Sequence, residues 1–219
     1  MTAAQSVTER DAPPIEEAAR RLFGWMRQHH PGAAFNPGAA AGEIRAAESR
    51  MGMAFPADLA ACLALANGEA FRSTGVIGNW TLLDLETIVA EYELMNDLAG
   101  RGAFGDNANP ATPFVKGVWW HSRWIPVVGS GSGHLICVDL DPNASGRTGQ
   151  IILFLHDAPA RYLIAHSLAG WFTRIADDLE RGVYTLQEEH GYWRFDNEAF
   201  MWSSIEGRDI YGAPPQVTA

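Results

Sequence analysis

The chain has 219 residues, 47% of them hydrophobic, and its 16 basic and 26 acidic residues leave a formal net charge of −10. This balance argues against nucleic acid or an anionic membrane surface as a partner, because both require a basic patch. We expect a cytoplasmic protein, because Cys62 and Cys137 lack CxxC spacing, no apolar run reaches the ~20 residues of a membrane span, and the first residues do not resemble a signal peptide.

The first third of the chain predicts a short leader and three helices. Residues 1–14 are polar, rich in alanine and end in Pro-Pro, which is typical of a disordered leader. Apolar residues at helical spacing then predict a helix from Ile15 to about His30 and a second that ends near Gly52. Pro56 opens a third helix, for which Asn67-Gly68 would supply the left-handed end that helices favour.

Outside the segment from Trp124 to His156, the rest of the chain predicts two strands and two helices. Residues 75–83 predict a short strand or hairpin, and a longer helix begins at about Leu85. Val115 to Trp120 has the pattern of a strand. Ser167 can cap a last helix, which Gly182 would close.

The segment from Trp124 to His156 predicts three strands, Ile125–Val128, Leu135–Leu140 and Ile151–Leu155. The last two are apolar on both alternating faces, which places them inside a sheet, and the short connections favour antiparallel hairpins. Pro126 cannot donate to a ladder, so it lies on an edge strand or at a bulge. The fold class is therefore α+β, with helices packed against a mainly antiparallel central sheet.

One domain over residues 15–185 accounts for these elements. The residues after it, 186–219, form an aromatic extension with Tyr192, Trp193, Phe195, Phe200 and Trp202, and its last residues are a frayed end. We expect the aromatic part to fold back onto the domain or to cover a neighbouring chain.

Two segments of the chain resemble the SUKH superfamily. Glu43–Glu69 is similar to its opening, in which a helix bearing a glutamate leads through an apolar-Pro-acidic turn to a helix ending in Asn-Gly. Trp124–Pro142 resembles its second hallmark, with Trp, Ile-Pro, a glycine-rich turn and a strand ending in aspartate. Two further segments, GQIILFLHD and HSLAGWFTRIADDLERG, are similar to the closing strand and helix of the family, so the similarity covers about residues 40–185. His134 departs from the pattern, because family members more often carry an acidic residue after the glycines.

The resemblance implies an α+β domain with a binding role. Members of the superfamily are similar to fungal regulators of cell-wall assembly, and bacterial members are immunity proteins that neutralise a cognate toxin, often a nuclease. Because the contacts of immunity proteins with their toxins vary, the resemblance assigns no binding residue in this chain.

The residues that suggest chemistry each have a simpler explanation. GSGSG at 129–133 precedes a strand rather than a helix, so it predicts a hairpin connection and not a phosphate cradle. His134, Asp139, Asp141 and His156 could form a metal site, but Asp-Pro-Asn is a turn signal, and we expect no metal, cofactor or catalytic residue.

Two histidines and one cysteine also receive structural interpretations. His29 and His30 end the first helix, where the helix dipole favours a cation. Cys137 lies among apolar residues of a central strand and is expected to be buried and inert.

The helix after residue 84 carries the first candidate binding surface. Glu86, Glu93 and Asp97 lie along one stripe with Asp84 and Glu91 beside it, and no basic residue occurs between Asp84 and Leu98. Such a face is either simply solvated or a docking surface for a basic partner.

Trp119, Trp120 and Arg123 form the second candidate surface. Tryptophan and arginine are enriched among binding anchors. Since neighbouring residues of a strand point to opposite faces, one indole is expected to be buried and the other half-exposed.

The main functional hypothesis is a non-catalytic immunity protein that occludes a basic toxin domain, as a monomer or a homodimer. A regulator or scaffold that holds an endogenous partner, like the fungal members of the superfamily, is the alternative. An enzyme using His134, Asp139 and Asp141 is the least favoured hypothesis.

Overall fold

The computed structural model describes residues 12–70, 75, 77, 80–105, 112–159, 161–189 and 192–195. Most of the predicted leader, residues 1–11, and the end of the extension, residues 196–219, lie outside this part. Within the described residues, no helix combines the length and the apolar character that a membrane span needs.

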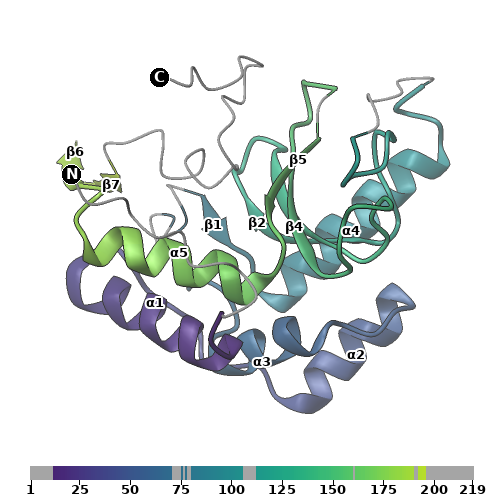
Figure 1. The fold of residues 1–219 in the computed structure, drawn as a ribbon. Coiled ribbons are helices and arrows are strands. Elements are labelled where there is room, and N and C mark those ends of the chain that lie inside the picture. The colour runs from purple at the N-terminus through teal and green to yellow at the C-terminus, as the bar shows by residue number, and fades with distance from the viewer. Residues whose placement is uncertain are drawn as a thin grey trace, which may run out of the picture.

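The described residues have an α+β fold, as predicted (Figure 1). The helices are α1 (Ile15–His29), α2 (Ala41–Met51), α3 (Ala57–Leu65), α4 (Leu85–Gly100) and α5 (Leu168–Glu180). The central sheet contains β1 (Thr81–Leu82), β2 (Trp124–Gly129), β3 (Leu135–Asp139), β4 (Gln150–Phe154) and β5 (Arg161–Ala165), and a separate hairpin contains β6 (Leu186–Glu189) and β7 (Tyr192–Phe195).

The sheet has the order β1-β2-β3-β4-β5, and all of its pairs are antiparallel. The three predicted strands are therefore confirmed as β2, β3 and β4. Pro126 lies inside the sheet at a shift of register between Pro126 and Val128, so of its two predicted positions the bulge is the one observed. The sequence reading missed β5, which pairs with β4 at the sheet edge.

The predicted strand over residues 115–120 is wrong. This segment forms bends and makes no ladder. Its backbone is held by side chains instead: Asn143 Nδ2 donates to Val115 O at 2.9 Å, and Val115 N donates to Thr112 Oγ1 at 2.8 Å. The apolar residues that suggested a strand belong to a loop packed against the sheet.

The sheet is buried on both faces, and different elements cover each face. Ile136, Val138 and Leu153 belong to a cluster with buried residues of α1, α3 and α5. Helix α5 contacts β4 and β5, and α1 packs along α5 (Figure 1). Cys137 and Ile152 point to the other face, where they share a cluster with Met95, Val115, Trp120, Trp124, Leu135 and Phe154.

Several helix ends follow the predicted chemistry, among them the end of α5, where Gly182 comes directly after the C-cap residue and is left-handed at φ +67°. Gly52 ends α2 in the left-handed conformation at φ +67°, and Ser167 Oγ accepts from Gly170 N at the start of α5. The prediction for α3 is wrong, because it ends at Ala66 in an extended conformation. Asn67 serves the next helix instead: its Oδ1 accepts from Leu85 N at 2.7 Å.

The start of the aromatic extension packs onto the domain. Strands β6 and β7 form an antiparallel hairpin. Phe195, at its end, is buried in the main core, and its ring lies 5.6 Å from that of His30. Phe195, together with the partly buried Leu186, thus adds buried apolar surface to the domain.

Candidate functional site

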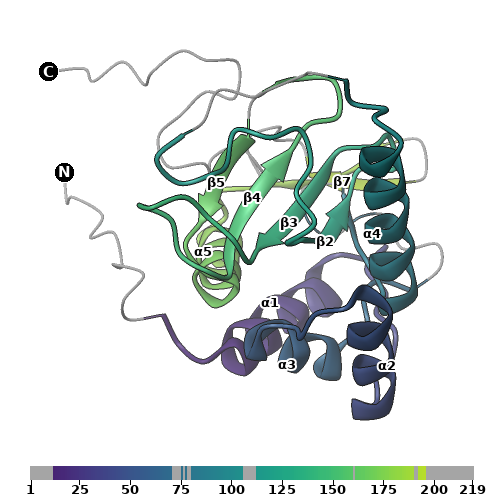
Figure 2. The ribbon, with the colours of Figure 1, turned by 90° about the vertical axis from the view of Figure 1, so that its right-hand side faces the viewer.

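Helix α4 is amphipathic and packs its apolar side against the rest of the fold. Its apolar side contains Leu85, Ile88, Val89 and Met95, which are buried. The helix contacts β2 and α2, and Figure 2 shows it at the side of the sheet, next to β2. Glu86, Glu93 and Asp97 are exposed, whereas Glu91 is half-buried.

The predicted acidic surface is partly neutralised within the chain. Glu93 pairs with Arg50 of α2 at 2.8 Å, and Asp97 pairs with Arg101, one turn further along, at 2.9 Å. Among the residues that the structure describes, no cation pairs with Glu86 or Glu91. The sequence could reveal Arg101 from its spacing, but Arg50 lies 43 positions away and meets Glu93 only because α2 packs beside α4.

Asp84 has a structural role in this helix. Its carboxylate accepts a hydrogen bond from Thr87 N at 2.8 Å and so caps the first turn of α4. This contact uses the side chain that the sequence had grouped with the docking surface.

Trp119, Trp120 and Arg123 lie in the loop that covers the second face of the sheet. Trp120 is buried, with its ring 5.6 Å from that of Phe154, whereas Trp119 is half-buried and Arg123 is exposed. One buried and one half-buried indole were predicted, although the segment is not a strand. Tyr92 of α4 joins this loop to the acidic helix, because its hydroxyl donates to Ser122 O at 3.1 Å.

Arg161 contacts both the ring and the backbone carbonyl of Trp119. The sequence analysis did not identify Arg161 as part of this surface. Its side chain is buried against the faces of Trp119 and Phe154, with the guanidinium carbon 5.0 and 4.2 Å from the ring centroids. It donates to Trp119 O at 2.8 Å and to Ala158 O at 2.8 Å. Burial lowers its pKa to about 10. The buried Arg161 side chain therefore holds the half-exposed Trp119 in position.

The four residues of the predicted metal site do not come together. Asp139 is buried at the far end of β3, where its carboxylate accepts from Asp141 N at 2.9 Å and from Gln150 Nε2 at 2.8 Å. Burial raises the pKa of Asp139. Asp141 forms an ion pair with Lys116. The Asp139 carboxylate thus holds the two ends of the β3–β4 turn together, whereas the Asp141 carboxylate ties this turn to Lys116 of the loop before β2.

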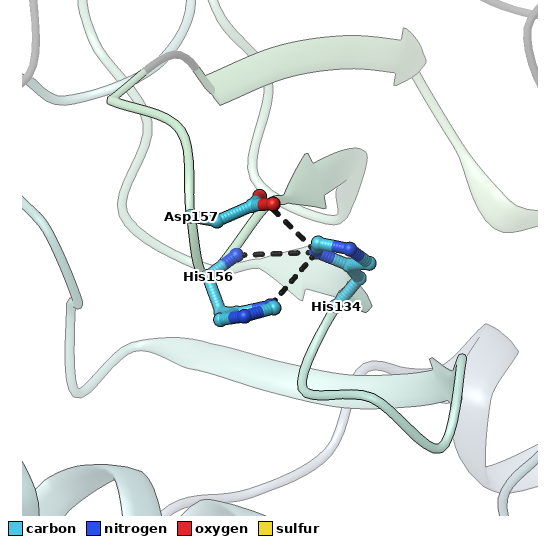
Figure 3. A group of neighbouring side chains, drawn as sticks. All are labelled: His134, His156 and Asp157. Atoms are coloured by element: carbon cyan, nitrogen blue, oxygen red, sulfur yellow. Dashed lines mark hydrogen bonds and ion pairs between the residues drawn. The ribbon is translucent and has the colours of Figure 1, made fainter.

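The two histidines of that set do meet, at the opposite end of the same hairpin. Figure 3 shows His134 facing His156 and Asp157, and the Nδ1 atoms of the two histidines are 3.2 Å apart. Asp157 Oδ1 lies 3.8 Å from His134 Nδ1. Of the residues that the structure describes, these three form the one group of His, Cys, Asp or Glu side chains close enough to share a metal ion.

The described residues also line an open hollow of about 220 Å³ between the starts of α3 and α5. Asp58 is the one titratable side chain among its lining residues, which include Pro56, Thr148 and Ser167. The hollow therefore offers no pair of groups for acid–base catalysis.

Comparison with known proteins identifies a family for most of the fold described above. The chain is 28% identical over 212 residues to the "Cell wall biosynthesis/cell cycle regulator smi1" of Schizosaccharomyces pombe, which covers 89% of this chain and 42% of that protein. It is 24% identical over 220 residues to the "Cell wall assembly regulator SMI1" of Saccharomyces cerevisiae, which covers 83% of this chain and 44% of that protein.

A third relative, the "KNR4/SMI1 homolog" of Yarrowia lipolytica, is 26% identical over 245 residues and covers 87% of this chain and 34% of that protein. The chain thus spans less than half the length of these curated relatives. Residues 38–174, which run from the loop before α2 into α5, match the sequence model of the SMI1 / KNR4 family (SUKH-1). The chain belongs to this family.

Proposed function

We propose that the chain is a non-catalytic regulatory domain that binds a protein partner, as in a regulator of cell-wall assembly. The observation that carries this proposal is the match to the SMI1 / KNR4 family together with the names of the fungal relatives, which are regulators and carry no catalytic term. The proposal corresponds to the alternative hypothesis of the sequence analysis.

The immunity hypothesis has less support. The relatives named above are fungal regulators rather than toxin inhibitors. In addition, two of the acidic side chains that were expected to face a basic toxin, Glu93 and Asp97, pair with arginines of the chain itself.

The binding surface that we propose consists of Glu86, Glu91, Trp119 and Arg123, and we call it the α4 surface. Glu86 and Glu91 supply negative charge that the described residues do not neutralise, which favours a partner with basic residues. Trp119 supplies a half-buried aromatic anchor that Arg161 holds in place. Partner recognition would therefore combine charge with one flat apolar contact.

A segment exchange tests the proposal. The matched segment of the S. cerevisiae regulator is replaced by this chain, and growth of the hybrid strain is measured on medium that stresses the cell wall. We expect growth at the level of the parent strain, and we expect Trp119→Ala combined with Glu91→Gln to reduce it. Glu16→Gln with Glu17→Gln on α1, which removes two carboxylates elsewhere, is the control and should leave growth unchanged. A hybrid that is made at parental levels but restores no growth would contradict the proposal.

A further inference from the structure

We propose that His134, His156 and Asp157 form a binding site for a divalent transition-metal ion such as Zn²⁺ (Figure 3). The proposal depends on the geometry of these side chains and not on the proposed function, since none of the three belongs to the α4 surface.

The antiparallel sheet brings the three residues together. Leu135 of β3 pairs with Phe154 of β4, so the residue before β3 lies beside the residues that follow β4. The turn before His134 is closed by Ser130, whose Oγ accepts from His134 N at 3.1 Å. Both histidines are therefore placed by paired strands, which keeps their backbones in position when the site is empty.

The distances fit the coordination geometry of zinc. Two nitrogens bound to a tetrahedral Zn²⁺ at about 2.05 Å each lie about 3.3 Å apart. The Nδ1 atoms of His134 and His156 are 3.2 Å apart. The 3.8 Å between His134 Nδ1 and Asp157 Oδ1 exceeds the tetrahedral edge by about 0.5 Å. The Asp157 side chain is 65% exposed, so it is free to rotate by that amount.

The donor atoms select the class of ion. Two imidazoles and one carboxylate suit zinc and its neighbours, whereas Mg²⁺ and Ca²⁺ prefer oxygen ligands alone. Three protein ligands on a tetrahedral ion leave a fourth position for water or for a group of a partner.

The hydrogen bonds assign a lone pair to one of the two histidines. His134 Nδ1 accepts a hydrogen bond from His156 N at 3.3 Å, so it carries a lone pair. An ordinary hydrogen bond between two imidazoles would give the same contact without a metal, and the experiment below separates the two explanations.

The surroundings leave room for this arrangement. Gly133 has φ +96°, and a Cβ atom at this position would lie 3.3 Å from the His156 ring. Trp80 stacks on His134 with the ring centroids 5.8 Å apart and an interplanar angle of 14°. Trp80 therefore places a fluorescent group beside the proposed site.

Titration calorimetry of the full chain with ZnCl₂, after removal of any purification tag, tests the proposal. We expect one high-affinity ion per chain, a rise in Tm with zinc, and a change in tryptophan fluorescence at the same stoichiometry. His134→Ala combined with His156→Ala should abolish this site, and Asp157→Asn should weaken it by about tenfold or more.

His29→Ala is the matched control, because it removes an exposed imidazole from α1 and should leave the zinc affinity unchanged. Substitution of Co²⁺ in the unaltered chain should give the intense visible absorption of a tetrahedral site. The proposal fails if the unaltered chain binds no zinc, if the double variant binds it as tightly, or if Co²⁺ shows no tetrahedral absorption.

Discussion

His30 shows how burial overrides the local helix environment. It caps the C-terminus of α1, where the helix dipole favours a cation, yet it is only 2% exposed and its ring packs against Phe195. Its Nδ1 accepts from Gly32 N at 3.2 Å, and its Nε2 has no hydrogen-bond partner among the described residues. Burial lowers its pKa, so for His30 the dipole explanation is wrong.

The lowered pKa makes the stability of the fold depend on pH. A group whose pKa is lower in the folded state contributes stability above its ordinary value, 6.5 for His30, and this contribution is lost as the pH falls through the folded pKa. We expect the free energy of unfolding in urea to decrease from about pH 7 to about pH 5. The decrease should be smaller in His30→Asn, a variant that removes the titrating imidazole but keeps an acceptor for Gly32 N. His29→Asn is the control and should keep the full decrease; an equal decrease in His30→Asn would refute the assignment. Burial also lowers the pKa values of His121 and His134, so these two histidines contribute to the decrease with the same sign.

Arg161 is the other residue whose role only the structure reveals. In the sequence it is one of fifteen arginines, and nothing near it distinguishes it from a surface residue. Its burial follows from its place on β5, opposite Phe154, where the guanidinium contacts two aromatic rings and backbone carbonyls of separate loops. No spacing rule connects these partners.

The acidic side chains of helix α4 differ in their contacts within the fold. Asp84 caps the helix, and Glu93 and Asp97 form exposed ion pairs of the kind that contribute about 0–1 kcal/mol. Glu86 and Glu91, which pair with no cation among the described residues, belong to the surface that we propose for a partner. The sequence predicted the helix and its acidic stripe but could not separate these roles, because the cation Arg50 comes from a different helix.

The two roles predict different effects for neighbouring substitutions. Asp84→Ala should lower the free energy of unfolding by about 1 kcal/mol, because Thr87 N loses its acceptor. Glu86→Ala removes an equal charge two residues further on and should change stability by less than about 0.5 kcal/mol. Chemical denaturation of the two variants checks this, and equal losses of stability would show that the capping contact contributes nothing.

The whole molecule includes part of the aromatic extension. The sequence placed the domain boundary near residue 185, where the similarity to the superfamily ends, shortly after the last predicted helix. The structure places Phe195, ten residues further on, in the main core with 4% of its surface exposed. The first part of the extension therefore contributes to the stability of the domain.

This contribution is measurable by truncating one side chain. Phe195→Ala should lower the free energy of unfolding by about 3 kcal/mol, because it leaves a cavity next to His30. Val183→Ala, at a position 49% exposed, should have little effect and serves as the control. An unaltered unfolding midpoint in Phe195→Ala would mean that the hairpin does not pack on the core in solution.

The sequence by itself determined the α+β class, the five helices and the three central strands. Local patterns predict these features: short-range periodicity, capping residues such as Ser167, and runs that are apolar on both faces. The order of these segments also carried the resemblance to the superfamily to which the chain belongs.

Only the tertiary structure decided which distant residues meet. Strand pairing places His134 beside His156 and Asp157, whereas Asp139 lies at the other end of β3. The packing of α2 beside α4 brings Arg50 to Glu93. The physical reason is that a side chain's neighbours across a sheet or between helices depend on register and packing angle. Both are set by the burial of the whole apolar surface and not by any local pattern of residues.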